Sequence, residues 1–233
     1  MDSGKTAFVL AGGMGTRLKP ITQKIPKPMA PIKGKPLLEH TIDSLKRADF
    51  TNITISVGYL KEQIMNYFGS GEKFHVNIKY ATEDTPLGTG GAIKRHASAF
   101  KSDFIVVNGD NVFDFDLREI YKAHRESRPM ATVGLGYAED VSQFGVVKME
   151  GNRITQFVEK PEGSSPPSHF VSTGVYVLSP AFLGLLPDGV SNVSRVLEKA
   201  VEKNTINGFV QNGDWFPCDN ISLYKKAARE WKR

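Results

Sequence analysis

The chain has 233 residues, of which 40% are hydrophobic and 24% are charged, and these proportions are typical of a globular domain. Its 30 basic and 25 acidic residues give a formal net charge of +5. This small excess suits an anionic ligand, but the basic residues are scattered and do not alternate with aromatic ones, which argues against a nucleic-acid-binding surface.

Strands and helices alternate along the first half of the chain. Short apolar runs rich in β-branched residues predict strands, and apolar residues at helical spacing predict helices. In chain order we expect a strand at 7–11, a helix beginning at Pro36, a strand at 53–57, a helix at 61–68, a strand at 76–80, a helix at 91–100 and a strand at 104–107. The alternation predicts βαβ units, and ligands in such sheets bind at the carboxyl ends of the strands.

The second half is richer in strands. We expect strands at 131–137, 145–149, 154–158 and 170–178, followed by helices at 194–202 and 222–231. The whole chain therefore predicts a Rossmann-like three-layer α/β fold with a mostly parallel mixed sheet and a β-rich subdomain. The length and the even composition favour one domain over residues 1–233, with halves at 1–115 and 116–233.

Three glycines, Gly12, Gly13 and Gly15, directly follow the first predicted strand. Without side chains they let backbone N–H groups approach phosphate oxygens, although a plain turn between strand and helix is the alternative. A dinucleotide fingerprint is excluded because position 18, three places after the last glycine, is a leucine. A P-loop is excluded because the Gly-Lys-Thr sequence at 4–6 lacks the earlier glycine and precedes the strand.

Two cationic side chains follow these glycines. Arg17 can bridge two phosphate oxygens with its planar guanidinium group. Lys27 stands between Pro26 and Pro28, which keep the backbone stiff and extended. A long side chain on such a backbone indicates that its charge has a fixed target, with a solvated lysine as the alternative. The segment therefore predicts a site for phosphate groups.

Cysteine content and hydropathy limit the cellular compartments in which we expect the protein. The single cysteine, Cys218, cannot form an intrachain disulfide and fits a reducing compartment. The apolar run near the N-terminus is too short for the core of a signal peptide, and no run approaches the roughly 18 residues of a membrane span. The histidines have no metal-ligand spacing. We expect a cytoplasmic protein with no nucleic-acid partner and no membrane partner.

Several motifs together resemble one family. Residues 12–18 (GGMGTRL), Pro20, Thr22 and residues 26–28 (PKP) resemble the signature of sugar-1-phosphate nucleotidylyltransferases, also called NDP-sugar pyrophosphorylases. The family's base-binding loop, metal-binding strand end and sugar-binding strands resemble residues 86–91 (PLGTGG), 108–110 (NGD), 144–147 (FGVV), 157–161 (FVEKP) and 172–176 (STGVY). Residues 28–32 (PMAPI) and 87–93 (LGTGGAI) are most similar to those of guanylyltransferases that act on mannose or manno-heptose 1-phosphate.

The resemblance implies that a nucleoside monophosphate passes from an NTP to a sugar 1-phosphate, and that pyrophosphate leaves. It implies that the half 1–115 binds the nucleotide and the half 116–233 the sugar phosphate. The implied nucleotide-binding residues are Leu10, Ala11, Gly12, Gly13, Gly15, Thr16, Glu83, Gly88 and Thr89. The implied sugar-binding residues are Gly145, Glu159, Thr173 and Gly174. Glu159 could instead pair with Lys160.

The resemblance also implies a catalytic set. Arg17 would hold the triphosphate and the departing pyrophosphate, Lys27 would neutralise charge near the α-phosphate, and Lys160 would hold the phosphate of the incoming sugar. Because two anions must meet, a divalent cation is expected. Asp110 and Asp219 are the implied ligands of Mg²⁺, which is commonly bound by one or two carboxylates together with substrate phosphates. Asp219 could instead cap the helix that follows it.

Glu83 bears on the choice of base. A carboxylate only accepts hydrogen bonds, and guanine offers two adjacent donors, so Glu83 favours GTP. Uracil N3–H is also a donor, and Glu83 could face solvent, so thymidylyl or uridylyl transfer to glucose 1-phosphate is an alternative. A non-catalytic regulatory subunit that binds a sugar nucleotide is another, but the complete catalytic set argues against it. A homo-oligomer is possible.

Overall fold

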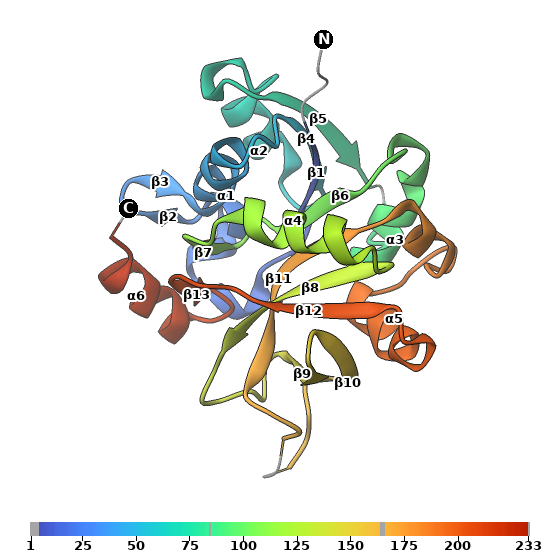
Figure 1. Ribbon diagram of the computed structural model, residues 1–233. Helices are drawn as coiled ribbons and strands as arrows, with labels where there is room; N and C mark the ends of the chain where they lie inside the picture. Colours follow the sequence, from blue (N-terminus) through green and yellow to red (C-terminus); the bar gives the residue numbers. More distant parts are fainter. Residues whose placement is uncertain (1–4, 84, 164–165, 233) are drawn as a thin grey trace. The chain divides into compact units, whose positions relative to one another are not determined.

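The computed structural model of the chain describes residues 5–83, 85–163 and 166–232 (Figure 1). The fold divides into two compact units. The first consists of Met1–Pro86, Val107–Leu117 and Gly213–Arg233, and the second of Leu87–Val106 and Arg118–Asn212. Each unit is therefore assembled from segments that are far apart in the sequence.

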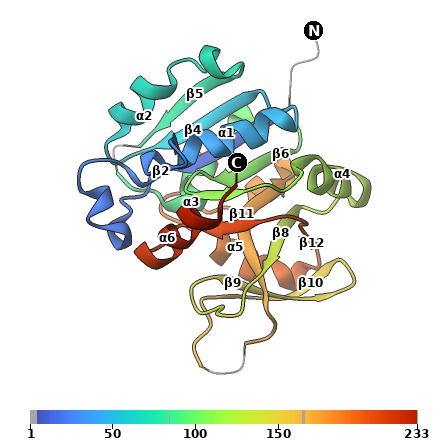
Figure 2. The same cartoon turned by 90° about the vertical axis from the view of Figure 1, so that its left-hand side faces the viewer.

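Three parallel strands form the sheet of the first unit: β1 (Thr6–Ala11), β4 (Asn52–Val57) and β5 (Asn77–Thr82), in the order β5-β4-β1. The register pairs Leu10 with Ser56 and Ser56 with Ala81, so the carboxyl ends of the three strands lie at one edge. Helices α1 (Leu37–Arg47) and α2 (Lys61–Phe68) follow β1 and β4 in the chain, and α1 crosses in front of these strands in Figure 2.

The last segment of the chain completes the first unit. Strand β13 (Trp215–Pro217) pairs antiparallel with β7 (Asn111–Phe113), and the short strands β2 (Pro31–Ile32) and β3 (Lys35–Pro36) form a hairpin. Helix α6 (Ile221–Glu230) lies beside β13 (Figure 1). Beneath it is a core of Leu18, Ala30, Ile32, Leu37, Val112, Cys218, Tyr224, Ala227 and Trp231.

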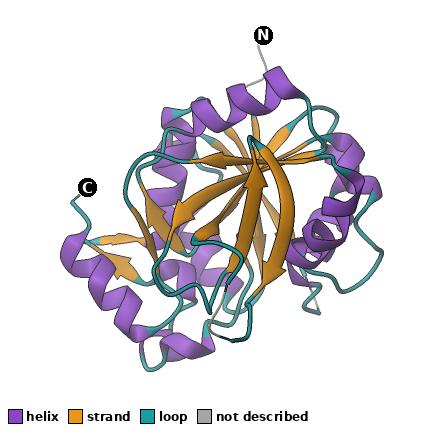
Figure 3. Ribbon diagram, turned by 60° about the horizontal axis from the view of Figure 1, so that its bottom comes forward, coloured by secondary structure: helices purple, strands orange, loops and turns teal. Residues whose placement is uncertain are grey.

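The second unit contains a mixed set of six strands in the order β6-β11-β8-β12-β10-β9 (coloured by type in Figure 3). These are β6 (Phe104–Asn108), whose last two residues belong to the first unit, β8 (Ala131–Tyr137), β9 (Gly145–Glu150), β10 (Arg153–Glu159), β11 (Phe170–Leu178) and β12 (Ile206–Val210). β12 runs parallel to β8, whereas β8 with β11, β10 with β12 and β9 with β10 are antiparallel.

The remaining helices are short. The α-helices are α3 (Gly88–Arg95), α4 (Leu117–Ser127) and α5 (Val193–Ala200). The 3₁₀ helices are η1 (Thr16–Leu18), η2 (Ile21–Gln23), η3 (Lys27–Met29), η4 (Glu72–Phe74), η5 (Ala97–Ala99), η6 (Pro180–Gly184) and η7 (Val201–Lys203). Within the part of the chain that the structure describes, no helix has the length and the apolar composition that crossing a bilayer requires.

The predicted α/β fold with a mixed sheet is confirmed, and every strand expected from the sequence is present within two residues of its predicted bounds. The parallel pairs are concentrated in the first unit, because the βαβ units lie there. One helix differs: α3 begins at Gly88 rather than at 91 and ends at Arg95. The helix starts earlier because its glycines pack against the loop at 189–192.

The two compact units do not follow the expected division between residues 115 and 116. Residues 87–106 belong with the second unit, and the C-terminal residues 213–233 return to the first. The physical reason for the return is the ladder between β7 and β13. Three-residue strands of this kind carry no periodicity of their own, so the sequence pattern does not reveal the ladder.

Candidate active site

The ladder between β7 and β13 brings two distant carboxylates together in the first unit. Asp110 directly precedes β7, and Asp219 follows β13 by two residues. The register pairs Asn111 with Pro217, and the Asn111 side-chain oxygen accepts a hydrogen bond from the backbone N–H of Cys218 at 3.3 Å. The strand pairing thus fixes the backbone positions from which the two carboxylate side chains extend.

Lys27 lies between these two carboxylates. Its ammonium group donates hydrogen bonds to Asp110 Oδ2 and to Asp219 Oδ1, each at 2.8 Å. Only 8% of the Lys27 side chain is exposed. Burial by itself lowers the pKa of Lys27, but the charges and hydrogen bonds of Asp110 and Asp219 outweigh it, and the net shift of the pKa is upward. Lys27 therefore stays charged, and its ammonium group is held by the two carboxylates rather than by solvent.

A cavity of about 230 Å³ opens at this cluster. Arg17 reaches into the same place, with its guanidinium Nη2 3.9 Å from Asp219 Oδ1. The cavity is lined by Leu10, Ala11, Gly13, Gly15, Thr16, Arg17, Lys27, Pro28, Asp110 and Asp219. All of these except Pro28 are residues that the sequence predicts for the site, so the structure brings the glycine loop, both cations and both acids around one cavity.

Gly15 joins the glycine loop to Lys27. It has a φ of +60° at the start of η1, and a Cβ atom there would lie 2.7 Å from the Cβ of Lys27. The hydroxyl of Thr22 donates to the Gly15 carbonyl at 2.8 Å. Position 15 thus needs glycine both for its backbone conformation and for the close approach of Lys27.

Gly12 has a different partner. A Cβ atom at Gly58 would lie 2.8 Å from the carbonyl oxygen of Gly12, so the turn after β4 packs directly on the glycine loop. Ser56, near the end of β4, is buried and donates from its hydroxyl to Glu83 Oε1 at 3.0 Å. Glu83 is therefore half-buried and held, and it does not simply face solvent. Neither Ser56 nor Gly58 was identified from the sequence; a glycine after a second strand end was the available signal.

The other predicted nucleotide-binding residues, Gly88 and Thr89, belong to the second unit. Gly88 has a φ of +71° at the start of α3. The hydroxyl oxygen of Thr89 accepts a hydrogen bond from the backbone N–H of Val193 at 2.9 Å. The side chain of Thr89 thus ties α3 to the first residue of α5.

The predicted sugar-binding residues also lie in the second unit. Gly145 pairs with Glu159 across β9 and β10, and a Cβ atom at Gly145 would lie 2.5 Å from the ring of Phe157 and 3.1 Å from Glu159 Oε2. Lys160 has a φ of +51° and donates its N–H to the Phe144 carbonyl at 2.9 Å. Glu159 and Lys160 form no ion pair with each other in this described segment, so that alternative is not what the structure shows.

Thr173 and Gly174 occupy a bulge in β11 between Ser172 and Tyr176. The Thr173 side chain is buried, with its hydroxyl 3.0 Å from the Gly134 carbonyl and 2.9 Å from Gln211 Oε1. A ligand contact at Thr173 would therefore fall to the backbone. Gly174 has a φ of +78°. Burial raises the pKa of the neighbouring Tyr176 to about 12, although a hydrogen bond from Ser172 opposes the shift.

The first cavity suits a hard divalent cation. Among the described residues there is no group of three or more His, Cys, Asp or Glu side chains that could hold a metal by themselves. Asp110 and Asp219 nevertheless converge on one cationic group, the ammonium of Lys27. Mg²⁺ is commonly held by one or two carboxylates together with substrate phosphates, so the two residues fit it. Asp219 does not cap α6, because Asn220 accepts from the Leu223 N–H instead.

Comparison with known proteins places the chain. A family model described as Nucleotidyl transferase matches residues 6–230, and the chain belongs to this family. It is 31% identical to a D-glycero-alpha-D-manno-heptose 1-phosphate guanylyltransferase of Aneurinibacillus thermoaerophilus, over 96% of this chain and 97% of that one. It is 34% identical to a mannose-1-phosphate guanylyltransferase of Mycobacterium tuberculosis, over 89% of this chain and 56% of that one.

Other relatives differ in length and in name. The chain is 34% identical to a bifunctional protein GlmU of Methanococcus maripaludis, over 90% of this chain, and spans about half the length of that relative. A solved structure of a putative glucose-1-phosphate thymidylyltransferase from Bacillus anthracis has a TM-score of 0.90 at 25% identity, covering 98% of this chain and 97% of that one. HddC from Yersinia pseudotuberculosis has a TM-score of 0.81 at 26% identity, covering 98% of this chain and all of that one.

Proposed function

We propose that this protein transfers a nucleoside monophosphate from an NTP to a sugar 1-phosphate and releases pyrophosphate, with GTP and mannose 1-phosphate or a related sugar as its substrates. The observation that supports this best is the cavity in which Lys27 bonds both Asp110 and Asp219 at 2.8 Å beside the glycine loop and Arg17. Membership of the nucleotidyl transferase family supports the reaction class.

The reaction is a displacement at phosphorus. An oxygen of the sugar 1-phosphate forms a bond to the α-phosphorus of the NTP, and the bond from that phosphorus to the oxygen bridging to the β-phosphate breaks. Little covalent help is needed from the protein, because positioning and charge stabilisation supply most of the catalysis. The backbone amides of the glycine loop and Arg17 would hold the triphosphate and the departing pyrophosphate.

The charge balance of the cavity suits such a ligand. Lys27 and Arg17 are matched by two carboxylates, so these four side chains are formally neutral together. Asp110 and Asp219 would hold Mg²⁺, which supplies positive charge and aligns phosphate oxygens when bound. In the free protein Lys27 donates hydrogen bonds to both carboxylates. In the loaded enzyme its ammonium group would turn to an oxygen of the α-phosphate.

The second unit would serve the sugar phosphate. Lys160 would hold its phosphate group, and Glu159 would accept hydrogen bonds from sugar hydroxyls. Glu159 faces Gly145 across the two strands, and a Cβ atom at Gly145 would crowd both the Phe157 ring and the Glu159 carboxylate. This assignment rests on the sequence pattern together with the absence of an ion pair between these two described side chains.

Glu83 supports guanine as the base. Ser56 holds one carboxylate oxygen of Glu83 at 3.0 Å, which fixes the direction of the acceptor. A held carboxylate can accept from guanine N1–H and N2–H together, whereas uracil and thymine offer only N3–H. The names of the two guanylyltransferase relatives agree with this choice, and the name of the thymidylyltransferase neighbour points to the pyrimidine alternative.

A substrate panel tests the proposal. GTP, UTP, dTTP, ATP and CTP are each combined with mannose, glucose and N-acetylglucosamine 1-phosphates, and pyrophosphate release is measured with Mg²⁺ present. We expect the highest kcat/KM with GTP and a manno-configured sugar. The highest rate with UTP or dTTP and glucose 1-phosphate would establish the pyrimidine alternative. Sugar-nucleotide binding without any turnover would establish the regulatory subunit.

A further inference from the structure

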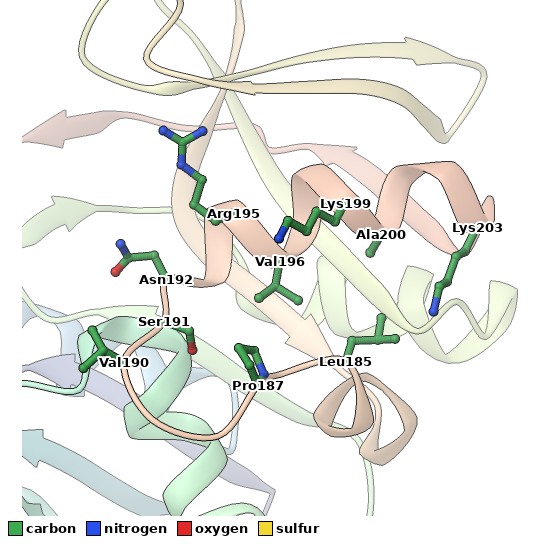
Figure 4. A pocket seen from close by; sticks show the side chains of 10 residues that line it. All are labelled: Leu185, Pro187, Val190, Ser191, Asn192, Arg195, Val196, Lys199, Ala200 and Lys203. Carbon is green, nitrogen blue, oxygen red and sulfur yellow. The ribbon is translucent and has the colours of Figure 1, made fainter.

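A second cavity, of about 520 Å³, lies in the second unit along α5 and the loop before it. Its walls come from one continuous segment, residues 185–203 (Figure 4). The apolar part of the wall is formed by Leu185, Pro187, Val190, Val196 and Ala200. None of the site residues predicted from the sequence lines it, so the proposed reaction leaves this cavity without a role. Its volume lies within the range of small-molecule sites.

The polar part of the wall is positively charged. Arg195, Lys199 and Lys203 follow one another at intervals of four residues, and none of the described residues that line the cavity is acidic. Arg195 is paired with Glu198 at 2.9 Å and points away from the other side chains in Figure 4. Lys199 and Lys203 form no hydrogen bond or ion pair with any residue that the structure describes.

Lys199 lies near the end of α5 and Lys203 in η7, and both side chains are exposed. Their ammonium groups point toward different ends of the cavity in Figure 4, and long exposed side chains can turn toward a ligand. Because both border an apolar cavity, an anion placed between them would balance their charge while its apolar part covers the wall. Charge complementarity and apolar contact therefore point to the same occupant.

We propose that this groove binds a small organic phosphate with an apolar body. The ammonium groups of Lys199 and Lys203 take the phosphate group, and Pro187, Val196 and Ala200 contact the apolar part. A small molecule fits better than a peptide, because one short segment builds the whole groove and the volume is that of a small ligand.

The groove is directly connected to α3. The carbonyl of Ser191, in the groove wall, accepts from the N–H of Gly90 at 2.8 Å and of Gly91 at 3.3 Å. A Cβ atom at Gly88 would lie 2.4 Å from that same carbonyl oxygen. Because this contact leaves no free space, a ligand that moves Ser191 also moves the start of α3. Only the effect of that movement on nucleotide use rests on the proposed function; binding itself does not.

The experiment follows the amide resonances of the intact protein in ¹H–¹⁵N spectra. Three probes are titrated: 1-naphthyl phosphate, which has both features, inorganic phosphate, which has the charge alone, and 2-naphthalenemethanol, which has the apolar body alone. We expect 1-naphthyl phosphate to shift the amides of Ser191, Val196 and Lys199, and those of Gly90 and Gly91 with the same concentration dependence. The other two probes are expected to bind the groove at least tenfold more weakly.

Variants separate the groove from the nucleotide cavity. The double variant Lys199→Gln/Lys203→Gln is expected to bind 1-naphthyl phosphate at least tenfold more weakly at residues 185–203. The matched control Lys225→Gln/Lys226→Gln, with the same change in charge on exposed positions of α6, is expected to bind as the parent protein does.

Four outcomes overturn the inference. They are equal affinity in the groove double variant, shifts confined to residues 10–28, equal groove binding by inorganic phosphate, and equal groove binding by 2-naphthalenemethanol, which would indicate an apolar docking surface. Groove binding that leaves Gly90 and Gly91 unshifted overturns the connection to α3. Because the readout is binding, these results stay separate from any failure of the substrate panel.

Discussion

At the scale of single residues, Lys27 determines the charge balance of the first cavity. Its ammonium group is almost fully buried and is shared between Asp110 and Asp219. The same ammonium keeps the carboxylates close together and neutralises part of their repulsion. Lys27 thus has a structural role in the free protein beside its proposed role toward the α-phosphate.

Replacement of Lys27 by methionine separates these roles. Without the ammonium, the two carboxylates repel each other, so the free protein becomes less stable and attracts divalent cations more strongly. We expect Mn²⁺ to bind at least about fivefold more tightly in the absence of nucleotide, since a unit charge about 4 Å away contributes about 1 kcal/mol even in a water-like medium. Turnover should fall. Electron paramagnetic resonance of free Mn²⁺ measures the affinity. Lys24→Met, at an exposed position, is the control. Weaker Mn²⁺ binding by a folded Lys27→Met variant would contradict the assignment of Asp110 and Asp219 as metal ligands.

The carboxylate of Asp110 is expected to be essential for turnover but not for folding. Asp110→Asn removes a charged ligand and should lower kcat by about 100-fold or more, which corresponds to about 2.7 kcal/mol. Because 28% of the Asp110 side chain is exposed, the melting temperature should change little. Asp114→Asn is the control, since an amide oxygen can still accept from the Asp214 N–H. Mg²⁺-dependent rates near those of the parent would contradict the assignment of Asp110 as a metal ligand.

Glu83 is expected to select the base. Glu83→Gln keeps the size of the side chain but replaces one acceptor by a donor. We expect the ratio of kcat/KM for GTP over UTP to fall by about tenfold, the effect of roughly 1.4 kcal/mol. The ratio is measured in competition between the two nucleotides, and an unchanged ratio with intact turnover would show that Glu83 does not read the base.

At the scale of elements, a short ladder completes a site that begins at the carboxyl end of the long strand β1. The long strands other than β12 were predictable because apolar and β-branched residues mark them, and the glycine loop was predictable from its place after β1. β12 was not predicted, because Asn207 and Gly208 interrupt its apolar residues. The ladder between β7 and β13 was not, since three-residue strands gain their structure from each other. The hydrogen bonds that Gly90 and Gly91 donate to the Ser191 carbonyl could not be predicted from the sequence either. The reason is that the glycines of 88–91 serve packing as well as a proposed ligand.

Helix α4 contributes a pH-dependent term to stability. Burial lowers the pKa of His124, and the carboxylate of Asp103 only partly opposes this. The unfolded chain therefore binds a proton near pH 6.5 that the folded protein does not bind until lower pH. We expect the free energy of unfolding to fall as the pH drops below about 6.5, with a slope of at most about 1.4 kcal/mol per pH unit from this group.

His124→Asn is expected to flatten this dependence. Urea unfolding between pH 7.5 and 5.5 measures the slope for the parent and for the variant. Thr132→Val is the control, because it removes the partner of His124 Nδ1, which lies at 2.9 Å, but keeps the imidazole; it should lower stability while retaining the slope. An equal slope in the parent and in His124→Asn would assign the pH dependence to other groups.

At the scale of the whole molecule, Cys218 offers a reporter of unfolding. It is the only cysteine in the chain and has no exposed surface in the core beneath α6. We expect a thiol reagent such as 5,5′-dithiobis(2-nitrobenzoate) to label it very slowly in native buffer and rapidly in denaturant, because labelling requires opening of that core. Nucleotide with Mg²⁺ should slow the native labelling further by stabilising the folded state. Rapid labelling of the folded protein would contradict this burial.

The interleaved path of the chain has a consequence during synthesis. One carboxylate of the cation cluster lies at residue 110, and the other reaches it only through β13, more than a hundred residues later in the sequence. A nascent polypeptide that has not yet reached residue 219 therefore cannot assemble the cluster, however well its earlier segments have folded. The ribosome must pass β13 before the cluster can form, so translation products that stop before residue 219 should be inert.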